Sequence, residues 1–152
     1  MFHIILFAPQ IPPNTGNIIR LSANTGATLH LIEPLGFCLD EKSCRRAGLD
    51  YHALADLHLH KNLDDCMAAL CTARLFAITS HGTASVFDSQ FAPGDAFLFG
   101  SETAGLPDAV HARLNPSQKL RLPMIAGNRS LNLANAASIV VYEAWRQTGF
   151  AV

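Results

Sequence analysis

Apolar runs and helix-periodic segments alternate along the whole chain. Short continuous or alternating apolar runs are typical of strands in a parallel sheet, whereas apolar residues at every third or fourth position predict amphipathic helices. The first pattern predicts strands at residues 2–8, 28–32, 57–60, 74–79, 96–100 and 119–122. The second predicts helices at residues 14–24, 40–47, 62–71 and 108–114, and a last helix from residue 130 or 132 through residue 145.

This alternation predicts the fold class. A strand–loop–helix–strand unit at residues 2–32 is typical of a parallel α/β sheet with a right-handed crossover. We find no internal repeat or linker that divides the chain, and therefore expect one domain over residues 1–152.

Capping residues predict where the first and last helices begin. Three prolines within residues 9–16 predict an extended path there, so the first helix should begin at Asn14 or Thr15. Gly26 should end it in a left-handed conformation. Ser130 or Asn132 should cap the last helix.

Three polar loops follow predicted strands and precede predicted helices, at residues 14–20, 100–106 and 124–132. Ligands gather at such carboxyl ends of strands in open α/β sheets, and glycines there allow close backbone approach. The dinucleotide fingerprint, the phosphate loop and the G-x-S-x-G nucleophile elbow are all missing, which argues against a Rossmann dehydrogenase, a P-loop NTPase and an α/β-hydrolase. Capped helices without a ligand remain the alternative.

A few charged residues are candidates for function. Arg20 lies on the first predicted helix and could pair with Glu102, although a solvated surface charge is the simpler interpretation. Lys42, Arg45 and Arg46 form one compact basic cluster, and Arg129 is a further isolated cation. The cluster is either a solvated helix face or a contact to a phosphate backbone.

Composition adds three limits. Hydrophobic residues make up 49% of the 152 residues and charged residues 15%, which favours a further buried surface such as a homo-oligomer interface. The net charge of −1 gives no global positive field for nucleic acid. The four cysteines contain no C-x-x-C pair, so we expect reduced thiols in the cytoplasm. No apolar stretch is long enough to span a membrane.

Histidine spacing does not favour a metal site. His58 and His60 would share one face of a strand, but no third ligand follows them at a suitable spacing. We therefore expect no metal.

Three motifs together resemble those of the SPOUT class of RNA 2'-O-ribose methyltransferases. They are Asn-Thr-Gly-Asn-Ile-Ile-Arg at 14–20, Gly-Ser-Glu-Thr-Ala-Gly-Leu at 100–106, and Leu-Pro-Met at 122–124 continuing to Arg-Ser-Leu-Asn-Leu-Ala-Asn at 129–135. The chain is most similar to the minimal, single-domain TrmL-type members, which methylate the wobble cytidine or uridine of certain leucine tRNAs. The resemblance covers essentially the whole chain.

The resemblance implies a fold and partners that periodicity does not predict. It implies a C-terminal trefoil knot, although chains in general do not knot. It also implies S-adenosylmethionine held in the knot loops, an obligate homodimer with the active site near the interface, and binding of the tRNA anticodon region.

The resemblance also assigns roles to residues. Arg20 matches the arginine proposed to activate the ribose 2'-hydroxyl, and Asn14 the asparagine that supports it. Ala104 departs from the pattern, because relatives often carry a basic or polar residue there, which puts one RNA contact in doubt. The predicted RNA contacts are Lys42, Arg45, Arg46 and Arg129. The predicted cofactor-binding residues are Ile78, Thr79, Gly100, Glu102, Gly105, Leu122, Met124, Ser130, Leu131 and Asn132.

The implied reaction is a displacement in which a ribose oxygen attacks the sulfonium methyl group, which requires no metal. A guanidinium stays protonated at neutral pH, so we expect Arg20 to stabilise the developing alkoxide rather than to act as a base. The alternatives are a non-catalytic RNA-binding protein on the same fold, a small-molecule α/β enzyme, or a 2'-O-methyltransferase acting on another RNA position.

Overall fold

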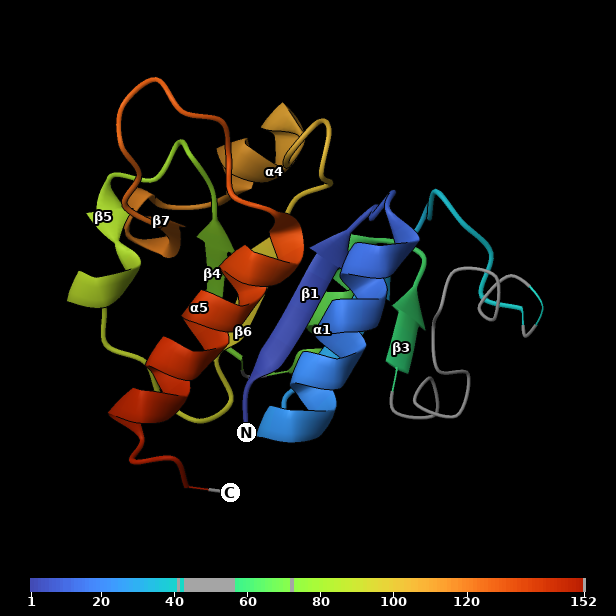
Figure 1. Cartoon of the computed structure of the whole chain (residues 1–152), viewed down its shortest axis with the longest axis horizontal. Helices are drawn as coiled ribbons and strands as arrows, with labels where there is room; N and C mark the ends of the chain where they lie inside the picture. Colours follow the sequence, from blue (N-terminus) through green and yellow to red (C-terminus); the bar gives the residue numbers. More distant parts are fainter. Residues whose placement is uncertain (41, 43–56, 72, 152) are drawn as a thin grey trace.

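The computed structural model describes residues 1–40, 42, 57–71 and 73–151, and places them around one parallel sheet (Figure 1). Its seven strands lie in the order β3-β2-β1-β6-β4-β7-β5, and all paired strands are parallel. The strands are β1 His3–Phe7, β2 Thr28–Ile32, β3 Leu57–His60, β4 Leu75–Ile78, β5 Ala84–Ser85, β6 Ala96–Phe99 and β7 Lys119–Arg121. The predicted α/β fold is confirmed.

Helices cover both faces of the sheet. Helices α1 (Pro12–Thr25) and α5 (Leu133–Gln147) lie side by side on one face (Figure 1), and α3 (Leu63–Leu70) and α4 (Asp108–Arg113) pack on the other. Successive side chains of β1 point to opposite faces of the sheet. Ile4 and Leu6 pack in the core beneath α1 and α5, and Ile5 packs in the core beneath α3 and α4. Both faces of the central strands are therefore buried, which explains their continuous apolar runs.

The structure corrects the predicted start of α1 and decides between the two predicted capping residues of α5. Helix α1 begins at Pro12 with Ile11 as N-cap, so the expected start at Asn14 or Thr15 is wrong. Proline is tolerated in a first turn because its missing N–H would have no helical partner there. Gly26 ends α1 with φ +70°, as predicted. Asn132, not Ser130, caps α5 by accepting hydrogen bonds from the backbone of Ala134 and Asn135.

Other local predictions differ in smaller ways. The segment between β4 and β6 contains the short strand β5 and the single-turn helix Val86–Asp88, which the sequence pattern did not predict. A second single-turn helix, Pro116–Gln118, precedes β7. The predicted helix at residues 40–47 lies, apart from residues 40 and 42, outside the described residues. The trefoil knot implied by the resemblance stays a prediction.

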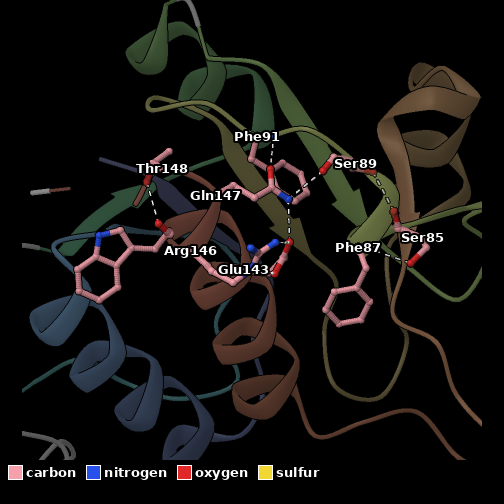
Figure 2. A network of polar contacts seen from close by, with 9 residues as sticks. Ser85, Phe87, Ser89, Phe91, Glu143, Arg146, Gln147 and Thr148 are labelled. Atoms are coloured by element: carbon pink, nitrogen blue, oxygen red, sulfur yellow. Dashed lines mark hydrogen bonds and ion pairs between the residues drawn. The ribbon is translucent and has the colours of Figure 1, made fainter. Parts of the chain in front are cut away.

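A polar network fastens the end of α5 to the segment between β5 and β6 (Figure 2). The Gln147 side chain accepts a hydrogen bond from the backbone N–H of Phe91 and donates to the carbonyl of Ser89 and to Glu143. Arg146 donates twice to Glu143 at the exposed edge of the network. Hydrogen bonds from Arg146 and from Gln147 lower the pKa of Glu143 to about 2, so this carboxylate remains ionised.

Gln147→Ala is expected to lower the free energy of unfolding by about 1–3 kcal/mol, because it leaves two partly buried backbone groups without partners. Arg146→Ala removes only an exposed ion pair and should cost at most about 1 kcal/mol. Urea unfolding of both variants checks the difference. Equal losses would show that Gln147 does not fasten this segment.

Candidate active site

The carboxyl ends of four central strands meet at one edge of the sheet and frame a cleft. In the strand register, Phe99 at the end of β6 pairs with Leu6 on β1 and with Ile78 on β4. Ile78 also pairs with Leu120 on β7. The loops that follow β4, β6 and β7 and the start of α5 enclose about 800 Å³. The cleft lies beside the boundary between β1 and β6, where the strand order changes from the run β3-β2-β1 to β6-β4-β7-β5. Such changes of strand order in open α/β sheets commonly bind ligands.

The residues that the resemblance assigned to cofactor binding all line this cleft, together with Asn14. They come from stretches far apart in the sequence, at residues 78–79, 100–105, 122–124 and 130–132. The fold therefore brings the predicted cofactor-binding residues together at one cleft. Their individual roles in binding remain predictions.

A chain of side-chain hydrogen bonds joins the three polar loops. One Glu102 carboxylate oxygen accepts from the backbone N–H of Gln10, at 2.8 Å. The other accepts from the N–H of Ile11 and from the Asn14 side-chain amide, each at 3.1 Å. The Asn14 carbonyl oxygen in turn accepts from the Asn132 amide at 2.8 Å. Asn14 is only 6% exposed, so these bonds satisfy a buried amide and fix the three loops relative to one another.

Two glycines shape the loop after β6. Ser101 and Gly105 exchange backbone hydrogen bonds of 2.9 and 3.1 Å, which folds the loop back onto itself. A Cβ atom on Gly100 would lie 2.2 Å from the carbonyl carbon of Gly105, so only glycine fits there. Gly105 has φ +67°, which side chains disfavour. Close backbone approach, predicted from the motif, is confirmed at Gly100.

Arg20 lies outside this cleft. Its side chain is exposed on α1. The possible Arg20–Glu102 pair is not among the ion pairs of the described residues, and Glu102 instead accepts hydrogen bonds from residues 10–14. Asn14 sits six residues earlier on α1, about one and two-thirds turns away, so the two side chains leave the helix in different directions.

The predicted RNA contacts are only partly placed. Arg129 is exposed in the loop before α5, next to Ser130 at the cleft, and Lys42 is exposed elsewhere. Arg45 and Arg46 lie outside the described residues.

Arg121, His81 and His111 also line the cleft and are among the residues that the sequence prediction did not name. Arg121 had a signal, since it is the outward residue between the inward Leu120 and Leu122 at the end of a strand. No sequence pattern indicated the two histidines, because they are thirty positions apart in the chain. In the fold their ring centroids lie 5.0 Å apart. Burial, and then the charges of His81 and Lys119, lower the pKa of His111, which favours its neutral form.

A model of the SpoU rRNA methylase family matches residues 1–142. The chain belongs to this family. It is 59% identical to the tRNA (cytidine(34)-2'-O)-methyltransferase of Burkholderia ambifaria over 99% of this chain and 97% of that protein.

Two solved structures have the same fold as this chain. One, described as giving structural insights into the 2-OH methylation of C/U34 on tRNA, is 45% identical, covers 99% of this chain and 98% of its own, and superposes with a TM-score of 0.88. The other is the SpoU methyltransferase AviRb of Streptomyces viridochromogenes in complex with AdoMet, with 27% identity, a TM-score of 0.81, and coverage of 96% of this chain and 57% of its own.

The cleft fits the cofactor of that second structure, S-adenosylmethionine. Its volume of about 800 Å³ lies in the range of small-molecule sites. Ile78, Leu122 and Leu131 offer apolar surface for an adenine ring. His111 Nδ1 is buried at the cleft without a hydrogen-bond partner in the described part of the chain, so a polar ligand atom could satisfy it.

Proposed function

We propose that this protein transfers the methyl group of S-adenosylmethionine to the ribose 2'-hydroxyl of nucleotide 34, the wobble cytidine or uridine, of leucine tRNAs. The observation that carries this proposal is the joining of Asn14, Glu102 and Asn132 in one cleft within a chain 59% identical to a tRNA (cytidine(34)-2'-O)-methyltransferase. When bound, the cofactor supplies an electrophilic methyl group on a sulfonium leaving group.

The residues of the cleft then have separate tasks. We propose that the loops at residues 78–79, 100–105, 122–124 and 130–132 bind the cofactor, which places its methyl group for attack. The network of Glu102, Asn14 and Asn132 holds these loops in one geometry. Alignment of this kind contributes much of the rate in a displacement that needs no metal.

Arg20 would act across a dimer interface. Because its side chain lies outside the cleft of its own chain, its proposed role in stabilising the ribose alkoxide requires the cleft of a second copy. Exposed apolar side chains support a homodimer: Ile139 and Tyr142 on α5 are 37% and 46% exposed in the single chain, and Ile125 beside the cleft is 81% exposed.

RNA binding would come from local patches summed over two subunits. Arg129 is exposed beside the cleft, where it could contact a tRNA phosphate, and Lys42, Arg45 and Arg46 would add a second patch. No helix in the described ranges is long and apolar enough to cross a membrane. We propose that the protein acts in the cytoplasm, where tRNA is available and where thiols such as the free Cys38, Cys66 and Cys71 stay reduced.

Two measurements test this function. Calorimetry should detect binding of S-adenosylmethionine, and methyl-labelled cofactor should transfer label to total tRNA. A protein that binds tRNA but neither binds nor consumes the cofactor would be a non-catalytic RNA-binding protein, which would overturn the proposal. Transfer of label to rRNA alone would keep the reaction type but refute the tRNA substrate.

A further inference from the structure

Four histidines and one cysteine cluster at the β3 edge of the sheet, away from the cleft. His3, His30 and His60 come from the adjacent strands β1, β2 and β3, and His58 stacks on His30 with ring centroids 5.0 Å apart. Cys66 reaches the cluster from α3, which packs over this face. His30 is 4% exposed and Cys66 is fully buried, so these polar groups must be satisfied within the protein.

The geometry brings three ligand atoms together. His30 Nδ1 lies 3.0 Å from His60 Nε2, and His30 Nε2 lies 3.2 Å from His3 Nδ1. One ligand atom each from His30, His60 and Cys66 lie within 4.8 Å of one another. Ligand atoms around tetrahedral zinc are about 3.3–3.6 Å apart, given bond lengths of about 2.0–2.3 Å. A shift of about 1 Å therefore completes the three-ligand set.

We propose that His30, His60 and Cys66 bind a zinc ion that links β2, β3 and α3. Two imidazoles and one thiolate are ligands that zinc prefers over magnesium or calcium. The ion would bind His30 Nδ1 and His60 Nε2 in place of the hydrogen bond between them. The proton of that bond would move to the other nitrogen of the ring that carries it, and the thiol proton of Cys66 would pass to solvent. A water molecule would complete the tetrahedron.

The surroundings match those of known metal-bound histidines. A ligating histidine usually donates its second ring N–H to a neighbour, and His30 Nε2 has such a neighbour in His3.

This proposal departs from our expectation from the sequence that no metal is bound. That expectation sought a third ligand near His58 and His60, whereas Cys66 and His30 become neighbours only when α3 packs over the parallel strands. The site lies outside the cleft, so the zinc would have a structural role and the methyl transfer would still need no metal.

The test uses the full chain, stripped of metal by a chelator and titrated with Zn²⁺ against a chromogenic competitor. We expect one ion per chain and a rise in melting temperature of about 5 °C at saturation. Co²⁺ in place of Zn²⁺ should give the sulfur-to-metal charge-transfer band of thiolate coordination. Binding of less than one ion per chain, or a Co²⁺ complex without this band, would overturn the proposal.

Variants locate the ion. His60→Gln and Cys66→Ala should each weaken Zn²⁺ binding at least about 100-fold. His60 is only partly buried, so His60→Gln keeps the test decisive if Cys66→Ala does not fold. Cys71→Ser, which alters an exposed thiol at the end of α3, should bind like the wild type. Wild-type affinity in His60→Gln would place the ion elsewhere and refute the site.

Discussion

Arg20→Ala should slow single-turnover methylation of tRNA by about 10²–10³-fold, the usual cost of removing one group that stabilises a developing oxyanion. The affinity for S-adenosylmethionine should not change, because Arg20 is exposed on α1 and does not line the cleft of its own chain. Rapid-quench kinetics at saturating tRNA, with calorimetry for the cofactor, measures both quantities.

The matched control for Arg20 is Arg113→Ala, which removes an exposed arginine that pairs with Asp64 on the other face of the sheet. It should keep the wild-type rate. An unchanged rate in Arg20→Ala would remove Arg20 from the reaction, whereas a loss of cofactor affinity would mean that it acts through binding.

Mixed dimers test whether Arg20 acts across the interface. At a cofactor concentration below the wild-type Kd, the Arg20→Ala dimer and the Glu102→Ala dimer should each have at most about a tenth of the wild-type activity. If Arg20 of one subunit serves the cleft of the other, a heterodimer of the two variants keeps one intact site and should regain up to half of the wild-type activity per dimer. No recovery in a heterodimer shown to form would contradict action across the interface.

Glu102→Ala should weaken binding of S-adenosylmethionine at least about tenfold and lower the free energy of unfolding by about 2–4 kcal/mol. The variant removes the acceptor of three hydrogen bonds, two from the backbone of residues 10–11 and one from Asn14. Without it the loop after β6 loses its connection to the start of α1, and the cofactor must order that loop on binding. Calorimetry and urea unfolding measure the two effects.

Two further variants distinguish the effect of the negative charge of Glu102 from the effect of its hydrogen bonds. Glu102→Gln keeps one acceptor oxygen and should fall between the wild type and Glu102→Ala. Glu33→Ala removes an exposed carboxylate that follows β2 at the same edge of the sheet but does not line the cleft, and should bind cofactor normally. If Glu33→Ala weakened binding as much as Glu102→Ala, general electrostatics rather than the hydrogen-bond network would be responsible.

Much of the fold was predictable because its signals are local. The continuous apolar runs of β1 and β6 come from burial on both faces, and the apolar stripe of α5 follows from packing against the sheet. The start of α1 was mispredicted because proline opposes a helix in its interior but not in its first turn. Strand β5 has only two residues, too few for a periodic pattern to emerge.

The site was predictable only in part. The resemblance placed the cofactor loops, and the fold does gather them at one cleft. The bonds that join them were not predictable, since Asn14 meets Glu102 and Asn132 across 88 and 118 positions of sequence. The cluster of His30, His60 and Cys66 was also not predictable, because it forms only when β2, β3 and α3 pack together.

The most direct test of the proposed function is to locate the methyl group on the product. Total tRNA lacking the modification is incubated with the protein and S-adenosylmethionine, digested, and analysed by mass spectrometry. The account predicts a 2'-O-methyl group on nucleotide 34 of leucine tRNAs, absent when Arg20→Ala replaces the wild type. A methyl group on a base, or on the ribose of a different nucleotide, would contradict it.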